Sequence, residues 1–313
     1  LPNLAASGLF MGLSIASKWT GMYAGVGLAA IFFWVMWRRL REGQAAERAL
    51  EEAPQLIPSG RLTSVQAAST QAVPRAVWTM LWCLLFFIAV PLMIYYISFY
   101  PWFVRTPGGL TIKKVWDASV SMYNYHSSPG LGMDHFFYSP WYQWPLSLKP
   151  MWFYQGRVHN GTGSTIVTFG NLAVWWGGLA GLLCMVMQWV KRPSLKLTTD
   201  SAQPSASAGT HTRDMVPALL VIAFLAQYLP WIPVPRGTYI YHYFPSVPFI
   251  ILSAVYALHL LEARRAKLAR RLLWCFVGVA IILFVAFFPY VSGVRVSTRW
   301  LDAMKWFPNW LYY

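Results

Sequence analysis

Charged residues are scarce in this chain. Lys, Arg, Asp and Glu together make up 11% of its 313 residues, whereas a soluble domain carries roughly 25%. Hydrophobic residues make up 57%, and several apolar runs reach the roughly 18 to 20 residues that a helix needs to cross a hydrocarbon core. Water is therefore not the main solvent. The sequence predicts an all-α bundle of transmembrane helices, because a lipid-facing backbone must satisfy its own hydrogen bonds.

Cysteine and acidic residues are also few. Cys83, Cys184 and Cys275 all fall in apolar runs, so neither a disulfide framework nor a cysteine metal site is predicted. The formal net charge is +15, but the basic residues lie in loops between apolar runs, so membrane topology explains them better than nucleic-acid binding. The chain begins with Leu1 and shows no leader with a charged start and a cleavage site, and we expect it to be the C-terminal part of a longer protein.

The apolar runs predict the membrane spans, and the cations between them predict the orientation. Spans are expected at residues 19–37, 77–98, 165–190, 215–231, 244–261 and 272–291, preceded by an apolar stub, 4–16. Lys and Arg are dense in three loops, which the positive-inside rule assigns to the cytoplasm: 38–76, 191–214 and 262–271. The intervening segments are expected to face outward.

Three regions follow from this topology. They are residues 1–98, with transmembrane segments and a cytoplasmic linker at 38–76; an outer loop, 99–164; and a C-terminal transmembrane bundle with an outer tail, 165–313. The linker is rich in Ala, Ser, Thr, Gln and Pro, which favours a flexible segment. The outer loop is rich in Trp, Tyr, Phe, Gly and His, so we expect a structured aromatic cap on the outer membrane surface.

One cation interrupts the apolar N-terminal region. Lys18 stands between the stub and the first span, next to Trp19. A cation at membrane depth is costly enough to indicate function, and an ammonium that faces a cavity can hold a lipid phosphate. A snorkelling lysine at a helix end, with Trp19 as its interfacial anchor, explains the pattern equally well.

A short outer turn, residues 235–245, combines arginine, tyrosine and histidine (PRGTYIYHYFP). The planar guanidinium of Arg236 suits a phosphate, and Tyr239 and His242 offer hydrogen bonds to phosphate or sugar. These three residues are therefore candidates for a phosphate and sugar site. An aromatic belt with one interfacial arginine is the alternative.

Aromatic residues and histidines crowd two runs of the outer loop, 122–126 (MYNYH) and 135–145 (HFFYSPWYQWP). Flat aromatic faces beside polar tips suit sugars and membrane interfaces alike. The candidate substrate contacts in these runs are His126, His135, Trp141 and Trp144. The spacing of the two histidines matches no standard zinc pattern, so no metal site is predicted.

Six segments, in a fixed order along the chain, carry a resemblance to a known family. They are 8–21, in which spaced glycines surround Lys18; 122–126; 135–145; 170–176, with Gly-Asn and Trp-Trp pairs; 236–245; and 304–310. Together they resemble the protein O-mannosyltransferases, and the matches extend over nearly the whole chain.

The resemblance implies a GT-C membrane glycosyltransferase. Such an enzyme takes a sugar, typically mannose, from a polyprenyl-phosphate carrier to a Ser or Thr hydroxyl of a secreted or membrane protein. By similarity to the related lipid-linked aminoarabinose transferases, Lys18 is expected to contact the carrier phosphate, and Arg236 to supply a second phosphate or sugar contact. The acidic catalytic pair of the family lies in its first outer loop, to which no segment here corresponds. The catalytic residues are therefore expected upstream, and the isolated chain is expected to be inactive.

Glycosyl transfer to a hydroxyl also needs a base that takes its proton. On the predicted outer face the carboxylates are Asp117, Asp134 and Asp302. Asp134 beside His135 is the best local candidate, although a turn or helix-cap aspartate is the commoner use. No essential cofactor is predicted, because fixed Lys and Arg side chains can take the charge of the leaving phosphate.

We expect the clusters around Lys18, residues 126–145 and Arg236 to converge on one pocket at the non-cytoplasmic surface, in the plasma membrane of a bacterium with the active face outward. Two other functions stay open. One is a GT-C transferase with a lipid or glycan acceptor. The other is a transporter whose aromatic loop gates a cavity, although the sequence shows no internal repeat of the kind that many carriers contain. A structural membrane subunit is a third possibility.

Overall fold

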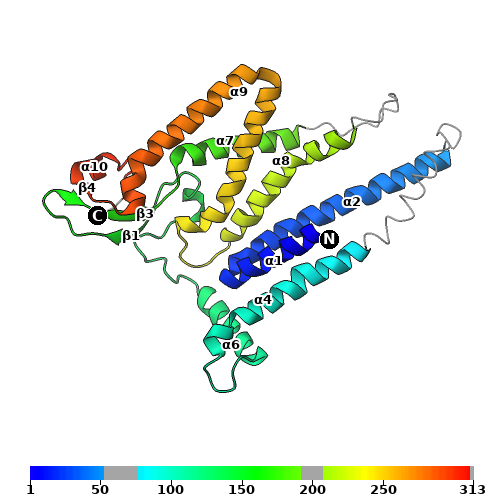
Figure 1. Ribbon diagram of the computed structural model, residues 1–313, viewed down its shortest axis with the longest axis horizontal. Coiled ribbons are helices and arrows are strands. Elements are labelled where there is room, and N and C mark those ends of the chain that lie inside the picture. Colours follow the sequence, from blue (N-terminus) through cyan, green and yellow to red (C-terminus); the bar gives the residue numbers. More distant parts are fainter. Residues whose placement is uncertain (53–76, 192–206, 311–313) are drawn as a thin grey trace. The chain divides into compact units, whose positions relative to one another are not determined.

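The computed structural model describes residues 1–52, 77–191 and 207–310, most of which are helical (Figure 1). The chain divides into two compact units, Leu1–Met122 and Tyr123–Tyr313, and each is described by itself. Within the described residues, four helical segments are long and apolar enough to cross a membrane: Trp19–Arg38, Val77–Phe103, Leu172–Val190 and Ile240–Ser292. A shorter apolar helix covers Met215–Trp231. The predicted class, a helical membrane bundle, is confirmed.

The N-terminal unit is built from helices. Its elements are α1 (Pro2–Ser17), the 3₁₀ turn η1 (Trp19–Gly21), α2 (Met22–Glu52), the π-helical segment η3 (Leu85–Ala89), α4 (Val90–Ser98), α5 (Tyr100–Phe103) and α6 (Ile112–His126), which continues into the second unit. The last residues of the predicted linker, 53–76, lie outside the described residues. Residues 42–52 continue α2, because Ala, Glu and Arg in this stretch favour a helix.

Two glycines, one turn apart, let α1 pack directly on the helix that contains η3 and α4. A Cβ atom at Gly8 would lie 2.1 Å from the carbonyl oxygen of Phe86, and one at Gly12 would lie 2.7 Å from Ile94 Cδ1. Small residues four positions apart allow close helix contacts in membranes. The glycine spacing around Lys18 therefore has a packing role on its N-terminal side.

The chain changes direction where α1 meets α2. Lys18 is extended, with φ −161° and ψ 134°, and its N–H donates to the Ser14 carbonyl at 2.9 Å. Gly21 then lies against Ser14, so close that a Cβ atom would be 2.6 Å from Ser14 Oγ. The break presents Lys18 at the end of α1, between two helices.

The C-terminal unit combines helices with two short ribbons. Its elements are η4 (Trp141–Gln143), β1 (Met151–Gln155), β2 (Thr162–Gly163), β3 (Thr165–Thr168), α7 (Leu172–Val190), α8 (Ser207–Tyr228), η5 (Leu229–Trp231), η6 (Ile240–Ser246), α9 (Val247–Ser292), β4 (Val296–Ser297) and α10 (Thr298–Ala303). The strands β1 and β3 form one antiparallel ribbon, and β2 and β4 form another.

The predicted span 165–190 begins too early. Residues 165–168 form β3, because this Thr-Ile-Val-Thr run is β-branched and alternates between buried and half-buried positions. The helix α7 starts only at Leu172, after Asn171, whose side chain accepts a hydrogen bond from the Val174 N–H at 3.3 Å. The span is therefore shorter than its apolar composition predicts.

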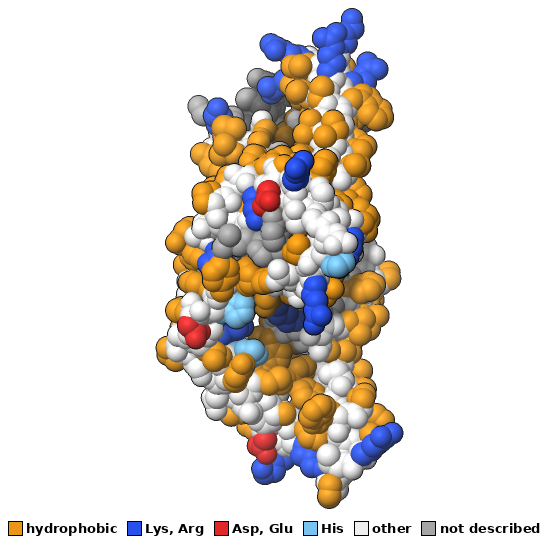
Figure 2. All heavy atoms as spheres, turned by 90° about the vertical axis from the view of Figure 1, so that its left-hand side faces the viewer, with side chains coloured by type: hydrophobic (Ala, Val, Ile, Leu, Met, Phe, Trp, Pro, Cys, Tyr) orange, Lys and Arg blue, Asp and Glu red, His pale blue; other side chains and the backbone are white. Residues whose placement is uncertain are grey.

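The long helix α9 is two helices joined at a sharp turn. Arg265 has non-helical angles, φ −144° and ψ 69°, and the helix folds back there (Figure 1). The turn holds the cations that separate the predicted spans 244–261 and 272–291: Arg264, Arg265, Lys267, Arg270 and Arg271. Figure 2 shows basic side chains gathered over this turn at the top of the view, and acidic side chains sparse on the whole face.

Glycines on α7 fit the helix against both arms of α9. A Cβ atom at Gly181 would lie 2.4 Å from the Ala254 nitrogen in the first arm, and one at Gly177 would lie 2.4 Å from the Phe276 ring in the second. Asn171 Nδ2 also donates to the Ala280 carbonyl of the second arm at 2.8 Å. These contacts fix the scaffold from which the loops of this unit project.

Candidate functional site

Two segments about one hundred residues apart form a joint surface in the C-terminal unit, which we call the loop–turn platform: residues 130–139 and 235–239. The N–H of Gly130 donates to the Pro235 carbonyl at 2.9 Å, and that of Gly237 donates to the Leu131 carbonyl at 2.7 Å. Ser139 N–H donates to the Thr238 carbonyl, and Thr238 Oγ1 donates back to the Ser139 carbonyl, both at 2.9 Å. The outer loop and the arginine turn are therefore one structure.

Glycine is required at the centre of this platform. A Cβ atom at Gly237 would lie 2.2 Å from the Gly132 carbonyl oxygen, far inside van der Waals contact. Gly130 and Gly132 have φ angles of 73° and 71°, which side chains disfavour. The backbone of both segments approaches so closely that Arg236 is held beside the aspartate and histidine of the loop.

Tyr239 lies where charged groups from both segments of the platform affect the pKa of one side chain. Its hydroxyl lies 3.5 Å from the Gly132 carbonyl, and its ring meets the His135 ring edge-on at 5.4 Å. Burial raises the pKa of Tyr239 above its ordinary value, Asp134 raises it further, and Arg236 opposes the shift. Asp134 and His135 are exposed and Arg236 is half-buried. The platform thus presents a cation, a carboxylate, an imidazole and a neutral phenol on one surface.

His242 supports this surface from below. It is buried, and its Nδ1 accepts a hydrogen bond from the Tyr239 N–H at 3.0 Å. Its ring lies 4.1 Å from the Trp231 ring and stacks on Trp144 at 5.9 Å. The predicted contact of His242 with a phosphate or sugar stays a prediction, because this arrangement by itself makes the residue a cap that positions Tyr239.

Trp144 and Trp141 differ in what they present. Trp144 is fully buried, and its Nε1 donates to the Ser139 carbonyl at 3.0 Å. Because its ring is buried, we do not include Trp144 in the proposed site. Sequence patterns alone do not distinguish such a core tryptophan from one at the surface. Trp141 is half-buried, and its carbonyl accepts a hydrogen bond from the Tyr228 hydroxyl at 3.0 Å, which leaves part of its ring accessible.

His126 ends α6 and is exposed, with its ring against Tyr125 at 5.2 Å. It lies outside the platform segments. Among the described residues, no group of three or more His, Cys, Asp or Glu side chains is arranged to hold a metal ion.

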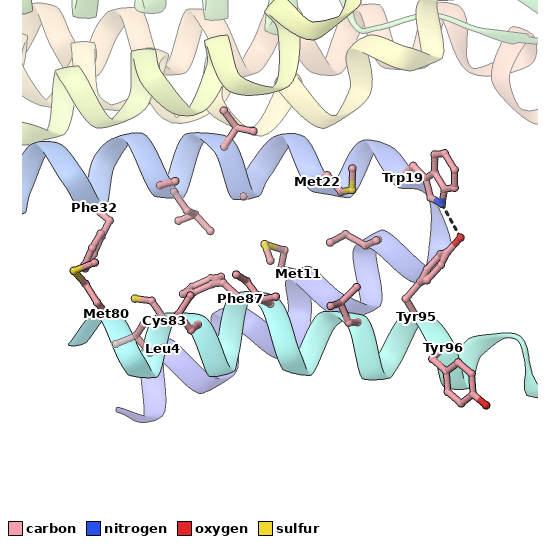
Figure 3. Close-up of a pocket in the computed structure, with 18 of the residues that line it drawn as sticks. Leu4, Met11, Trp19, Met22, Phe32, Met80, Cys83, Phe87, Tyr95 and Tyr96 are labelled. Atoms are coloured by element: carbon pink, nitrogen blue, oxygen red, sulfur yellow. Dashed lines mark hydrogen bonds between the residues drawn. The ribbon is translucent and has the colours of Figure 1, made fainter. Parts of the chain in front are cut away.

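The N-terminal unit contains a pocket that the sequence patterns did not reveal. It has a volume of about 1180 Å³ and lies between α2 and the helix that contains α4, with α1 and α6 at its sides. Figure 3 shows Phe32 and Met80 at one end and Trp19 and Tyr95 at the other. Many of the lining side chains, including Val26 and Leu84, are more than half exposed, so the pocket is open to its surroundings.

Three polar side chains that line the pocket, Trp19, Tyr95 and Ser119, are joined by hydrogen bonds. Trp19 Nε1 donates to the Tyr95 hydroxyl at 3.0 Å, which lies 2.9 Å from Ser119 Oγ (Figure 3 shows the first of these bonds). Ser119 Oγ donates in turn to the Val115 carbonyl at 2.7 Å. These three side chains are therefore hydrogen-bonded, and most of the other residues that line the pocket are apolar.

Lys18 directly precedes Trp19 and is exposed. It therefore stands at the polar end of the pocket, where α1 and α2 meet. The structure brings the outer loop and Arg236 together, as the sequence predicts. Lys18 belongs to the other unit, and its convergence with them on one pocket stays a prediction.

Comparisons with known proteins agree on one family. The model of the C-terminal four-transmembrane region of protein-O-mannosyltransferase matches residues 111–310. The chain is 23% identical to the polyprenol-phosphate-mannose–protein mannosyltransferase of Corynebacterium glutamicum, with 97% of this chain and 57% of that protein covered. The protein of the same name from Mycobacterium tuberculosis is 21% identical, with 97% and 56% covered. The chain thus spans little more than half the length of these curated relatives.

Among solved structures, the Saccharomyces cerevisiae protein O-mannosyltransferase Pmt1–Pmt2 complex bound to the sugar donor is similar. The identity is 18%, the TM-score is 0.49, and the match covers 64% of this chain and 27% of that chain.

Proposed function

Because the chain belongs to the protein O-mannosyltransferase family, we propose that it takes part in the transfer of mannose from a polyprenyl-phosphate carrier to Ser or Thr hydroxyls of proteins. The names of the bacterial relatives state a polyprenol-phosphate-mannose donor and a protein acceptor. Since the chain covers little more than half of those proteins, the activity belongs to the intact protein that contains it.

The apolar pocket of the N-terminal unit carries this proposal. A polyprenyl chain is a long hydrocarbon without hydrogen-bonding groups, and the pocket matches it because its lining is mostly apolar and Trp19, Tyr95 and Ser119 are already hydrogen-bonded. Its volume, about 1180 Å³, has room for several prenyl units. Two of the helices that line it, Trp19–Arg38 and Val77–Phe103, are apolar enough to cross a membrane, so a carrier can enter from the lipid without leaving a hydrocarbon environment.

Lys18 then takes the phosphate that joins carrier and sugar. It stands beside Trp19, which lines the pocket, and an ammonium is a compact charge for a phosphate oxygen. Arg236 on the platform supplies a second contact with phosphate or sugar. Arg236 is half-buried, and its backbone lies in the turn whose Gly237 bonds to the outer loop, which places its charge on the platform for a developing negative charge.

The transfer itself breaks one bond and forms one. The hydroxyl oxygen of the acceptor attacks the anomeric carbon, the bond from that carbon to the phosphate oxygen breaks, and the phosphate leaves with the electron pair. A base takes the hydroxyl proton. Asp134 and His135 are exposed on the platform and remain the local candidates, while Tyr239 stays neutral because its pKa is raised and can donate to a sugar oxygen.

The orientation follows from the hairpin that α9 forms, in which the sharp turn is one end and the first and last residues of the helix are the other. Its sharp turn holds a cluster of cations around Arg265, whereas its first residue, Val247, directly follows the turn that holds Arg236. The positive-inside rule places the cationic turn in the cytoplasm. The platform then faces outward, where secreted and membrane proteins present their hydroxyls.

Substitution of Lys18 tests the phosphate contact. In the intact protein, Lys18→Ala is expected to raise the KM for polyprenyl-phosphate mannose about tenfold or more, since a charge-assisted hydrogen bond is worth about 1.5 to 3 kcal/mol. Lys113→Ala is the matched control, because Lys113 is exposed and paired with Asp117 at 2.7 Å. An unchanged donor affinity in Lys18→Ala would reject the phosphate role.

A second pair of variants tests the pocket. Ala29 lines it, whereas the neighbouring Ala30 does not. Ala29→Trp is expected to fill part of the space and weaken binding of a long-chain donor more than that of a short-chain analogue, while Ala30→Trp leaves both unchanged. Equal effects of the two variants would exclude the pocket as the carrier site. Peptide and lipid acceptors in the same assay separate a protein mannosyltransferase from a transferase that modifies lipid.

A further inference from the structure

A second cluster of cations lies at the end of α9 opposite to its sharp turn. Arg157, Arg295 and Arg299 are all exposed and belong to the β2–β4 ribbon and its flanks, residues 157–163 and 294–299. We call this segment pair the basic ribbon. It lies at the same end of α9 as the Arg236 turn, where the positive-inside rule makes clustered cations uncommon.

The basic ribbon is rigid. Thr162 pairs with Ser297 and Gly163 with Val296, and the Thr298 N–H donates to the Gly161 carbonyl at 2.9 Å. Asn160 and Gly161 turn the chain with positive φ angles of 49° and 69°, as a two-residue hairpin requires. The backbone from which the arginines project is therefore held by these bonds.

Arg295 ties the two halves of the ribbon together. Its guanidinium donates to the Arg157 carbonyl at 3.1 Å and to the Thr162 carbonyl at 3.4 Å. These are neutral acceptors, so the charge of Arg295 is not cancelled, and it lies beside the backbone of Arg157.

Within residues 1–52, 77–191 and 207–310, no salt bridge joins a carboxylate to this cluster. Asp302, on α10 next to the ribbon, bonds to Lys305 at 3.1 Å, and Asp134 acts on Tyr239 in the platform. The salt bridges formed between described residues include none of the three arginines. A ligand of the ribbon therefore meets uncompensated positive charge.

The ribbon lies where a membrane span ends. The apolar helix ends at Ser292, and Arg295 follows three residues later. Trp300 Nε1 donates to the Ala286 carbonyl of that helix at 3.2 Å, and the Trp300 ring is 43% exposed. Tryptophan prefers the level of lipid headgroups. Val158 and Val294, each next to an arginine, are also about half exposed, as suits a surface in contact with lipid.

We propose that the basic ribbon binds the phosphates of anionic phospholipids, such as phosphatidylglycerol, in the leaflet that surrounds the Ser292 end of α9. Guanidinium groups bind phosphate oxygens through paired N–H donors, and the exposed valines contact the start of the acyl chains. An acidic polypeptide also matches the charge, but the aromatic anchor and the exposed valines favour a lipid. The inference does not depend on sugar transfer, because it uses only the membrane spans and the charges at their end.

Photo-crosslinking in nanodiscs tests this site. The intact protein is placed in nanodiscs with phosphatidylglycerol or phosphatidylcholine that carries a diazirine near the headgroup, and labelled peptides are mapped by mass spectrometry. We expect peptides with residues 153–160 and 294–300 to be labelled several-fold more by phosphatidylglycerol, with the preference falling as salt rises. Arg157→Gln/Arg299→Gln is expected to remove most of this preference, because each arginine near an anionic lipid surface contributes to binding. Arg295 is left in place because it holds the ribbon together.

Two control variants complete the experiment. Arg264→Gln/Arg271→Gln removes two charges at the other end of α9 and is expected to leave labelling of the ribbon unchanged. Arg157→Lys/Arg299→Lys keeps the charges and is expected to keep most of the preference, which separates lost charge from lost folding. Equal labelling by both lipids in the unaltered protein would overturn the proposal. A lipid preference that survives in Arg157→Gln/Arg299→Gln would also overturn it. The same holds if that variant has a higher donor KM while the unaltered protein shows no lipid preference.

Discussion

The two units of this protein differ in how far their aromatic and apolar side chains are buried. Among the described residues of the C-terminal unit, Trp144, Tyr243, Tyr290 and Trp310 are fully buried. Among the described residues of the N-terminal unit, the buried apolar side chains are those of Met11, Pro91 and Val115, and a pocket of about 1180 Å³ stays open between its helices. In lipid an exposed apolar side chain costs little, so burial here marks specific packing. The C-terminal unit is a closed scaffold, and the N-terminal unit, with its open pocket, is the receptor that we propose for the carrier.

Hydrogen bonds follow the same division. In the C-terminal unit, buried rings anchor loops: Trp310 Nε1 donates to the distant Ser147 carbonyl at 2.9 Å, and the Tyr290 hydroxyl donates to the Leu301 carbonyl eleven residues later. In the N-terminal unit, the bonds from Trp19 through Tyr95 to Ser119 close one end of the pocket. The first set stabilises a fold, and the second shapes a binding surface.

The largest effect expected from this contrast is the loss of a core ring. Trp144→Ala removes a fully buried indole that bonds to Ser139 and stacks on His242, so the free energy of unfolding should fall by about 3 to 5 kcal/mol. Trp102→Ala, at a position that is 77% exposed in the N-terminal unit, should change it far less. Denaturation of both variants in mixed micelles measures the difference. Equal losses would break the contrast between scaffold and receptor.

Sequence reasoning recovered the features of this fold that depend on composition and on local pattern. The apolar runs located the helical spans, and the cations of residues 262–271 marked the turn that divides α9 at Arg265. The arginine turn and the outer loop were both singled out, and they meet in the platform. Each of these signals is contained within about twenty residues of chain.

What sequence could not supply depends on contacts between distant residues. Trp144 and Trp141 lie in the same aromatic-rich run of the sequence, yet Trp144 is buried and Trp141 is half-buried. Residues 165–168 looked like the start of a span because Ile and Val are apolar, but pairing with β1 makes them a strand. The pocket arises from four helices, of which Gly8 and Gly12 set the spacing of one pair, α1 and the helix that contains α4, and no pattern along one helix reveals the space between several.

A substitution with an expected effect of intermediate size tests how the helices of the N-terminal unit are held together. Gly12→Leu places a side chain where even a Cβ atom would be 2.7 Å from Ile94, which should destabilise the packing of α1 by about 1 to 3 kcal/mol. It should also alter the pocket, because Met11 and Ile15 of α1 line it. Gly278→Leu is the matched control in the other unit, since a Cβ there meets nothing within 4 Å. Thermal unfolding and donor binding by the two variants provide the measurement.

If Gly12→Leu kept both its unfolding temperature and its donor affinity, the glycine spacing would have no packing role. The contrast would then rest on the C-terminal unit alone.

The smallest expected effect concerns Tyr239, the one platform residue whose protonation links the scaffold to its charges. Burial and Asp134 raise its pKa above the ordinary value, and Arg236 opposes them. A raised pKa means that the folded state holds the proton more tightly than the unfolded state, so this contribution to stability is complete below about pH 9 and is lost as the pH rises through the raised pKa. Tyr239→Phe removes the titrating group, and its unfolding free energy should fall less between about pH 9 and 11 than that of the unaltered protein. Tyr142→Phe, at an exposed position of the same loop, serves as the reference. Parallel pH curves for the unaltered protein and Tyr239→Phe would show that the phenol is not coupled to the platform, and the neutral donor assigned to it would have to be another group.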